Sequence, residues 1–182
     1  MHAYLTTKET DATTLYAVHQ FVWGLLPKMP SGVEAPYLFT MKGAQVLIRT
    51  PLPLDDTSKK EEIDFKVGDR LYVQVVLNPV KRSQGKECPI KGVVGLKDYG
   101  QRIFEAAGLR VLPMEMADEE DESSMFVRLL VPELENSKNI PIHAARYNAS
   151  VEVVDVDIFQ NALLNGVGRK KRFGCGMMLF RR

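Results

Sequence analysis

The stretch ALLNGVGRKKRFGCGMMLF, residues 162–180, joins a helix-like apolar run to a strand-like apolar run through two glycine pairs and four consecutive cations. A dinucleotide-binding loop needs a strand before its glycines and a helix after them, so that the pyrophosphate meets the helix N-terminus. The order here is the reverse, and no glycine has the GxxxxGK[ST] spacing of a nucleoside triphosphate loop. Both kinds of nucleotide site are therefore excluded.

What remains is a loop whose cations can bind phosphates and whose aromatic ring can stack on a base or anchor the loop. Phosphate contacts of this kind give affinity without sequence information. The other interpretation is a solvated basic turn, and composition alone does not decide between the two. The candidates for RNA binding in this loop are Gly166, Gly168, Arg169, Lys170, Lys171, Arg172, Phe173, Gly174 and Gly176.

The bulk composition is that of an ordinary globular protein. The chain has 182 residues, of which 45% are hydrophobic and 26% are charged. No run resembles a signal peptide or a membrane span, and the two cysteines, Cys88 and Cys175, lack metal-ligand spacing. The sequence therefore predicts a cytoplasmic protein that uses no metal, no cofactor and no membrane.

Charge is distributed unevenly along the chain, although the net charge is only +1. The range 115–122 carries acidic side chains and no basic one, whereas the range 166–182 carries basic side chains and no acidic one. We expect the acidic run to be a solvated loop and the basic run to face a polyanion, because local charges of one sign set the local potential.

Hydrophobic periodicity and turn residues predict two successive sets of strands and helices. The helix at 10–27 has Thr10 or Asp11 as its expected cap, the helix at 156–166 has Asp155 or Asp157, and a turn is expected at Lys42-Gly43. Strands are expected at 2–7, 36–50 (a hairpin), 70–79, 109–113, 125–132, 147–154 and 175–182, and helices at 10–27, 93–108 and 156–166.

This order predicts an α+β fold of two tandem ferredoxin-like (RRM-like) βαββαβ domains, each with a sheet on one side and helices on the other. The segment KRSQGKECP, 81–89, is polar and rich in residues that break regular structure, so the boundary is placed there. The expected domains are 1–84 and 85–182.

The block at 162–180 resembles the glycine-rich signature of the CRISPR repeat-processing endoribonucleases of the RAMP superfamily, and most of all their CasE branch. LNPVKRSQGK, 77–86, is similar to the asparagine-proline segment of that branch, and PYLFTMKGAQVLIRTPLPL, 36–54, is similar to its hairpin and proline turn. The resemblance implies that Lys81, Arg82 and Lys86 join the cations of the glycine loop in binding RNA.

His19 lies on the flank of the first predicted helix, beside its apolar stripe, and Tyr16 shares its surface one turn earlier. By default such a histidine is a partly buried packing residue. The resemblance implies a catalytic role, because the YxxH pair of the family falls on Tyr16 and His19. It also implies metal-independent cleavage, in which the 2′-hydroxyl of the RNA attacks the adjacent phosphorus and leaves 2′,3′-cyclic phosphate and 5′-hydroxyl ends.

Histidine suits this chemistry because its reference pKa of about 6.5 permits proton transfer near neutrality. Whether His19 acts as base or acid stays open, while Tyr16 would orient an oxygen or donate a hydrogen bond to the phosphate. The implied partners are the CRISPR repeat RNA hairpin and other subunits of the interference complex. The alternatives are a non-catalytic RAMP scaffold subunit that binds guide RNA, and a generic RNA-binding sandwich.

Overall fold

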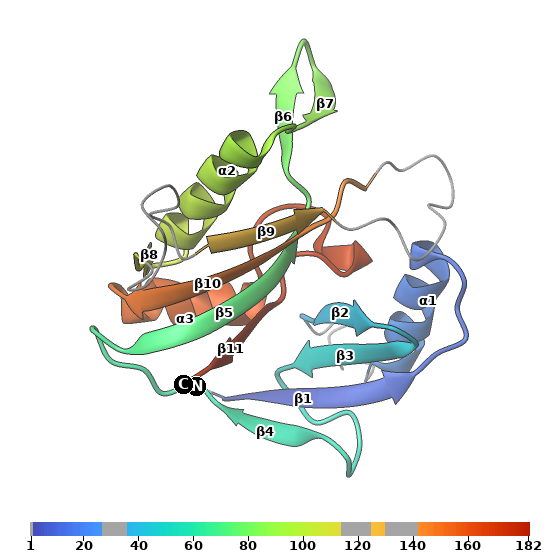
Figure 1. Ribbon diagram of the computed structural model, residues 1–182. Coiled ribbons are helices and arrows are strands. Elements are labelled where there is room, and N and C mark those ends of the chain that lie inside the picture. The colour runs from blue at the N-terminus through green and yellow to red at the C-terminus, as the bar shows by residue number, and fades with distance from the viewer. Residues whose placement is uncertain (1, 27–35, 114–124, 130–141) are drawn as a thin grey trace.

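The computed structural model describes residues 2–26, 36–113, 125–129 and 142–182. Two larger antiparallel sheets lie next to each other, with a small two-stranded hairpin projecting from the body (Figure 1). The N- and C-termini lie together at one side of the molecule (Figure 1). The predicted acidic loop at 115–122 and the strand residues 130–132 lie outside the described residues.

The first sheet has the strand order β2-β3-β1-β4, with antiparallel neighbours throughout. The hairpin predicted around Lys42 and Gly43 is confirmed, since Lys42 pairs with Gln45 and Gly43 has a φ of 59°. The elements are β1 (His2–Glu9), α1 (Leu15–Leu25), β2 (Leu38–Lys42), β3 (Gln45–Thr50) and β4 (Lys59–Glu62). Helix α1 buries Val18 and Val22 in a small core with β2 and β3.

Helix α1 begins later than the sequence predicted. Its cap is Thr14, whose hydroxyl accepts a hydrogen bond from the Ala17 amide at 3.1 Å. The hydroxyl of Thr10, expected as a cap with Asp11, instead accepts from the Ala12 amide in the turn before the helix. Threonine side chains can bond the backbone in either conformation, so the pattern alone does not locate the start. The expected helix end at Pro27 lies outside the described residues.

Between β3 and β4 the chain forms turns at residues 51–58, where a complete ferredoxin-like unit has its second helix. Pro51 and Pro53 lie at the start of this segment. Proline lacks the amide hydrogen that a helix interior needs, which disfavours a helix there. The first domain is therefore a ferredoxin-like unit that retains only its first helix.

The second sheet has the order β11-β5-β10-β8, and β9 pairs with β10 beside β8. This is the strand order of a complete βαββαβ unit in which β5, β8 with β9, β10 and β11 are the four strands. The expected fold class, two tandem ferredoxin-like domains, is confirmed. The elements are β5 (Arg70–Leu77), α2 (Val93–Ala106), β8 (Leu109–Val111), β9 (Met125–Leu129), β10 (Ala145–Val153), α3 (Val156–Asn165) and β11 (Met178–Arg181).

The two helices of this unit cover one face of the sheet and end where the sequence predicted. Asp155 caps α3 by accepting a hydrogen bond from the Ile158 amide at 2.9 Å, and Gly166 follows the helix with a φ of 69°. Gly108, the predicted stop of α2, has a φ of 75° directly after the C-cap. Phe104 of α2 and Phe159 of α3 are fully buried against the sheet.

The two sheets divide between β4 and β5, upstream of the boundary that we expected after residue 84. Strand β5 pairs with β10 and β11, so it is the first strand of the second sheet and not the last strand of the first. The alternation of buried and exposed residues in 70–77 identifies a strand, but it does not identify the sheet that the strand joins. We infer that the chain passes between domains at 63–69.

The segment at 81–89, where the domain boundary was expected, is instead part of a β-hairpin inserted between β5 and α2. Its strands are β6 (Val80–Ser83) and β7 (Lys86–Pro89), joined by a turn in which Gln84 and Gly85 both have positive φ. The hairpin projects from the body at the top of Figure 1. Among the described residues, no helix is long and apolar enough to cross a membrane.

Candidate functional site

His19 lies in a cluster of aromatic rings at the edge of the first domain. Its side chain is largely buried, with 7% of the residue exposed. Tyr16 and Trp23, one helical turn on either side, have ring centroids 6.4 and 5.7 Å from that of His19. Two further rings come from outside the helix. The ring of Tyr37 stacks on that of His19 with 6.3 Å between their centroids, and the ring of Phe173 is tilted against it with 6.1 Å between centroids. These five residues are called the aromatic cluster below.

Phe173 brings the glycine loop, residues 166–177, to this helix. The residue ends a single 3₁₀ turn, Lys171–Phe173, within the loop. His19 and Phe173 lie more than 150 residues apart in the chain. In the folded chain they are neighbours, so the helix of the first domain and the loop of the second domain form one site.

Tyr37 is one residue of this site that the sequence did not reveal. Its hydroxyl forms a hydrogen bond of 2.9 Å with Nδ1 of His19. Tyr37 directly precedes β2, and no spacing rule links that position to a helix residue eighteen positions earlier. A hydroxyl can donate to the neutral nitrogen or accept from the protonated one. The bond can therefore hold the imidazole ring in place in both protonation states.

The glycines of the loop are needed for contacts within the protein. A Cβ atom on Gly176 would lie 2.2 Å from the carbonyl oxygen of Val167, because the two ends of the loop are joined by a hydrogen bond of 2.9 Å from the Val167 amide to the Gly176 oxygen. A Cβ atom on Gly166 would lie 2.6 Å from the side chain of Leu38 in β2. Gly166 and Gly176 thus close the loop and seat it on the first sheet.

Three of the four loop cations have partners in the protein itself. Arg169 forms an ion pair with Glu87 at 2.9 Å, and Lys170 approaches the same carboxylate at 3.8 Å. Lys171 donates a hydrogen bond of 2.8 Å to the carbonyl oxygen of Asn165. Arg172 is exposed. The loop therefore presents its charge in an arrangement that is already fixed by neighbouring groups.

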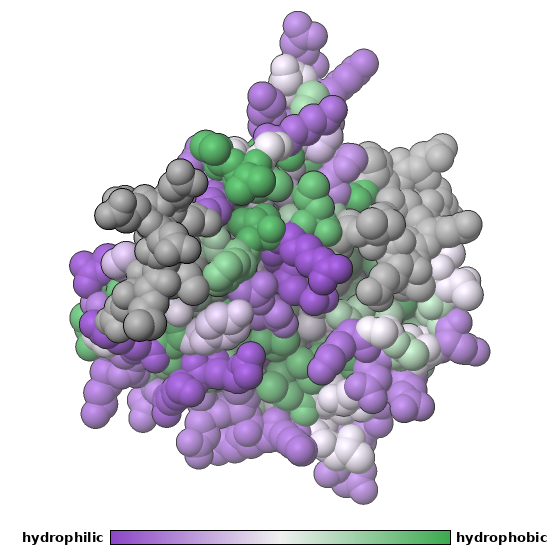
Figure 2. All heavy atoms as spheres, in the orientation of Figure 1, coloured by the Kyte–Doolittle hydropathy of each residue, from purple (hydrophilic) through white to green (hydrophobic). Residues whose placement is uncertain are grey.

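Glu87 belongs to β7, so its ion pairs tie the hairpin to the glycine loop. The hairpin cations Lys81, Arg82 and Lys86 are all exposed, and the hairpin surface is mostly hydrophilic (Figure 2). The structure thus connects the two groups of predicted RNA-binding cations through one carboxylate. Nothing in the sequence marks Glu87 as special, because an acidic residue in a basic segment is ordinary charge balance.

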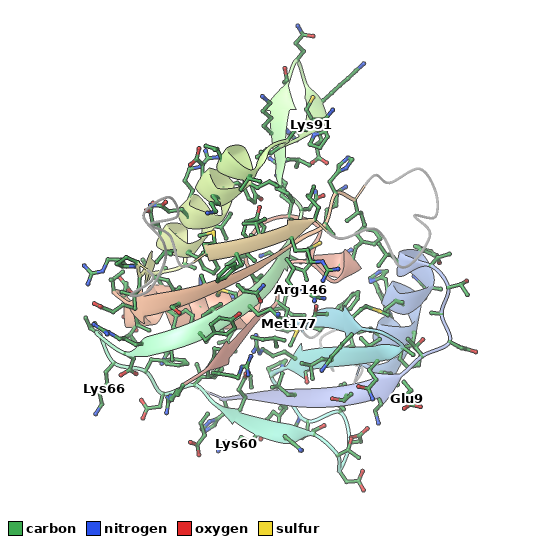
Figure 3. The ribbon with its side chains drawn as sticks, in the orientation of Figure 1. Glu9, Lys60, Lys66, Lys91, Arg146 and Met177 are labelled. Atoms are coloured by element: carbon green, nitrogen blue, oxygen red, sulfur yellow. The ribbon has the colours of Figure 1, made fainter. Side chains whose placement is uncertain are left out.

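Cys175 of the glycine loop is fully buried, which does not suit a nucleophile. Burial raises the pKa of its thiol to about 12, an effect that Lys170 only partly offsets. Nucleophilic cysteines need the opposite shift, since the thiolate is the reactive form. The next residues, including the labelled Met177 between the two sheets in Figure 3, are buried and anchor the end of the loop.

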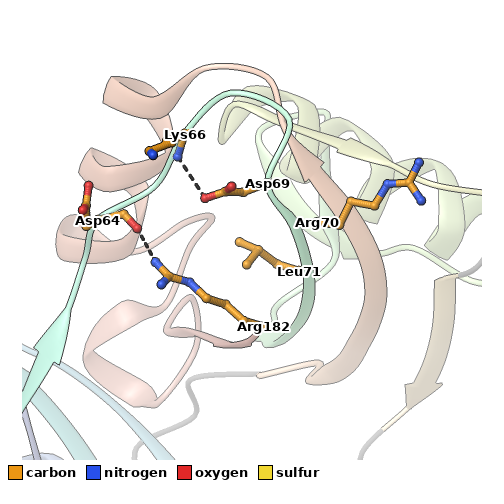
Figure 4. Close-up of a pocket in the computed structure, with 6 residues that line it drawn as sticks. All are labelled: Asp64, Lys66, Asp69, Arg70, Leu71 and Arg182. Atoms are coloured by element: carbon orange, nitrogen blue, oxygen red, sulfur yellow. Dashed lines mark hydrogen bonds between the residues drawn. The ribbon is translucent and has the colours of Figure 1, made fainter.

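A pocket lies elsewhere, where residues 63–69 pass from the first sheet to the second (Figure 4). Two hydrogen bonds join residues of its lining: a carboxylate oxygen of Asp69 accepts from the Lys66 amide, and Arg182 donates to the carbonyl oxygen of Asp64. It shares no residue with the aromatic cluster or the glycine loop. Among the described residues, no three histidine, cysteine or acidic side chains are grouped as metal ligands.

Comparison with known proteins places the whole chain in one group. A family model described as CRISPR associated protein matches residues 2–182. A structure of Thermus thermophilus Cse3 bound to an RNA representing a pre-cleavage complex superposes with a TM-score of 0.81 at 20% identity, covering 100% of both chains. No curated protein matches the chain.

Two further solved structures have the same fold. The CRISPR-associated protein Cas6e from Escherichia coli K-12 has a TM-score of 0.70 at 21% identity, covering 99% of this chain and 98% of that one. A chain of E. coli Cascade bound to a PAM-containing double-stranded DNA target has a TM-score of 0.60 at 18% identity, covering 99% and 98%. At these identities the likeness concerns the fold.

Proposed function

The chain belongs to the family of CRISPR associated proteins, and from this premise we propose that it is an endoribonuclease that cleaves CRISPR precursor RNA within the repeat. One observation supports the proposal above all others. The ring of His19, on a helix of the first domain, has its centroid 6.1 Å from that of Phe173, in the cationic glycine loop of the second domain. A proton-transfer group and a phosphate-binding loop therefore meet at one place, as the cleavage of a ribose-phosphate linkage requires.

The reaction needs no group beyond the RNA and these side chains. The 2′-oxygen attacks the adjacent phosphorus while the bond from phosphorus to the 5′-oxygen breaks. The 2′-hydroxyl loses a proton and the departing 5′-oxygen gains one. The products are a 2′,3′-cyclic phosphate and a 5′-hydroxyl end, and no metal ion is part of the proposal.

His19 is the proposed proton-transfer group. Tyr37 occupies Nδ1, so Nε2 is the nitrogen through which a proton would pass to or from the RNA. In either role Nδ1 carries a proton and donates it to the Tyr37 oxygen: Nε2 is a base when the ring is neutral and an acid when the ring is protonated. One positioned group of this kind is typically worth about 10²–10⁴-fold in rate.

Tyr16 is the second proposed catalytic residue. Its ring lies beside that of His19 on the same surface of α1. A phenol there can orient the attacking or departing oxygen, or donate a hydrogen bond to a phosphoryl oxygen as charge develops on it. Holding the 2′-oxygen in line with the departing oxygen contributes at least as much to the rate as proton transfer does.

RNA binding is assigned to the glycine loop and to the β6–β7 hairpin. The exposed Lys81, Arg82 and Lys86 would contact the backbone of a short RNA stem, since an A-form helix hides the base edges of its major groove from side chains. The loop residues Gly166, Gly168, Arg169, Lys170, Lys171, Arg172, Phe173, Gly174 and Gly176 would bind the phosphates near the scissile linkage. The partners of the protein are then the repeat RNA hairpin and other subunits of the interference complex, in which the product stays bound.

The experiment is incubation of repeat RNA with the purified protein in a chelator, with the ends of the products identified. We expect one cut per repeat, a 2′,3′-cyclic phosphate on the upstream fragment, and the same rate with and without chelator. Intact RNA after incubation with the parent protein contradicts the proposal. A linear 3′-phosphate formed at once, or inhibition by the chelator, contradicts the proposed chemistry.

The burial of His19 favours one alternative, a non-catalytic scaffold subunit of a CRISPR ribonucleoprotein. A histidine with 7% exposure and a tyrosine partner can be a packing residue that only anchors the loop. The same incubation separates the two functions, because a scaffold binds repeat RNA tightly and leaves it uncut.

A further inference from the structure

Arg49 of β3 is a buried cation at the junction of the two domains. Its side chain is 1% exposed and forms two hydrogen bonds with the carboxylate of Glu61 in β4, of 2.7 Å from Nε and 2.8 Å from Nη2. Its remaining nitrogen, Nη1, donates to two carbonyl oxygens of the second domain, those of Leu163 at 3.1 Å and Met178 at 2.9 Å. One guanidinium thus joins β3, β4 and the second domain.

The two carbonyl groups bracket the glycine loop. Leu163 lies in the last turn of α3, just before the loop, and Met178 begins β11 directly after it. The carbonyl groups in the last turn of a helix lack partners within the helix, and a cation there also interacts favourably with the helix dipole. Arg49 therefore holds both ends of the loop at a single point.

Strand β2, which pairs with β3, also contacts the loop. Leu38 and Phe39 of β2 lie within 2.6 and 3.2 Å of the positions that Cβ atoms would take on Gly166 and Gly174. Strand β2 pairs with β3, which carries Arg49, and α1 packs against this part of the sheet through Phe39 and Ile48. A shift of the loop relative to Arg49 would therefore change the distance between Phe173 and His19.

A buried ion pair of this kind has a large desolvation penalty, so holding two domains together does not by itself account for it. Taking an arginine and a glutamate out of water costs several kcal/mol per ion, and apolar residues often stabilise a fold equally well. What the guanidinium offers is geometry, because its planar fork fixes the directions of up to five donors at once. Four of those directions are used here, toward Glu61, Leu163 and Met178.

We propose that Arg49 is a positioning residue for the cleavage reaction: by clamping both ends of the glycine loop to the sheet that supports α1, it sets the placement of the loop over His19. The inference rests on the proposed function, since it assigns a purpose to the meeting of loop and helix. In this proposal Arg49 acts through the loop and does not contact RNA.

The test replaces the buried pair together, as Arg49→Met with Glu61→Gln, because removing the arginine alone would leave an unpaired buried carboxylate. We expect the single-turnover rate constant at saturating RNA to fall between about 10- and 100-fold, the range that a misplacement near 1 Å can produce. The dissociation constant for repeat RNA is expected to stay within about twofold, because the loop keeps its cations. A rate equal to that of the parent protein overturns the proposal.

The matched control is the exposed pair Arg110→Met with Glu152→Gln, which joins β8 to β10 at 2.6 Å and lies apart from the loop. This double variant is expected to cleave at the parental rate. The conservative variant Arg49→Lys keeps the charge beside Glu61 but loses the fork, so we expect a rate between those of the parent and the double variant. If the double variant does not fold, Arg49→Lys decides: a parental rate overturns the proposal.

Hydrogen exchange provides a readout besides activity. In the double variant the amides of residues 166–177 are expected to exchange at least tenfold faster, while those of β10 keep their parental rates. Unchanged exchange in the loop contradicts the clamp even if cleavage falls. If the proposed function is wrong, the parent protein itself leaves repeat RNA intact. The exchange experiment still tests whether Arg49 holds the loop, because it does not depend on cleavage.

Discussion

The aromatic cluster around His19 and the cations around the glycine loop lie next to each other, yet they are built in opposite ways. The imidazole of His19 is buried among four rings and held by the Tyr37 hydroxyl. The loop and hairpin cations lie nearer the surface, and Arg169, with 46% of its side chain exposed, is held by one carboxylate. Under the proposed function, catalysis depends on a ring held in a fixed position and RNA binding on accessible charge, and the two lie side by side in the same site.

This difference predicts that the rate of cleavage and the affinity for RNA can be changed independently. A buried, hydrogen-bonded group acts through geometry, which salt does not screen. Exposed cations act through charge, and their contribution falls as ionic strength rises. Variants in the aromatic cluster are therefore expected to change the rate, and variants of the loop and hairpin the affinity.

The largest effect is expected for His19→Ala. The variant loses the proposed proton-transfer group, so the single-turnover rate constant should fall by about 10²–10⁴-fold. The dissociation constant for repeat RNA should stay close to that of the parent protein, because the cations are untouched. Gel-based cleavage and binding assays on the same preparation measure both; a parental rate removes His19 from the mechanism.

The next effect is expected when Arg169, Lys170, Lys171 and Arg172 are all replaced by glutamine. Affinity at low salt should fall by on the order of 10²-fold, and the slope of log affinity against log salt should become shallower by about 3, close to 0.7–0.9 for each lost phosphate contact. Titrations at several salt concentrations measure the slope. An unchanged slope would show that the loop makes no phosphate contacts.

A smaller effect is expected for Tyr37→Phe, which keeps the ring beside His19 and removes only the hydroxyl. A hydrogen bond worth about 1–1.4 kcal/mol corresponds to roughly a five- to tenfold loss of rate. RNA affinity should not change. Tyr72→Phe is the matched control, because this tyrosine lies on β5 outside the aromatic cluster; equal rates for both variants would contradict a role for the bond to Nδ1.

The smallest effect is expected for Glu87→Gln, and it is a gain. The carboxylate neutralises Arg169 and Lys170 in the absence of RNA, so its removal frees charge for phosphates. Because partly exposed ion pairs contribute about 0.2–1 kcal/mol, affinity should rise by no more than about fivefold. The gain should shrink in high salt, and weaker binding would instead show that Glu87 helps to shape the site for RNA.

Much of the fold could be predicted from the sequence because it depends on local patterns. Asp155 before an apolar helical run and Gly43 between two apolar strands specify their caps and turns without help from the rest of the chain. The partner of β5 could not be predicted, because alternation marks a strand and not its neighbours. The hairpin at 80–89 was also missed, since its polar residues belong to a strand pair with no core to cover.

The residues of the candidate site also fall into those that local sequence patterns predict and those that only the folded structure reveals. Tyr16 and His19 were predicted together because they are one helical turn apart, and the loop cations because they are consecutive. Tyr37, Glu87 and Arg49 act through contacts between segments far apart in the chain, and each is an ordinary residue in its local context. Their roles follow from tertiary packing, which no spacing within one segment encodes.

The most direct test of the central claim is a crosslinking experiment on a bound, uncleavable RNA. Repeat RNA with a 2′-deoxy sugar at the scissile nucleotide and a photoreactive base beside it is bound, irradiated, and the attached peptides are identified. We predict crosslinks to both α1, residues 15–25, and the glycine loop, residues 166–177. Crosslinks to the loop alone, with α1 unmodified, would contradict the claim that His19 and the loop act on the same linkage.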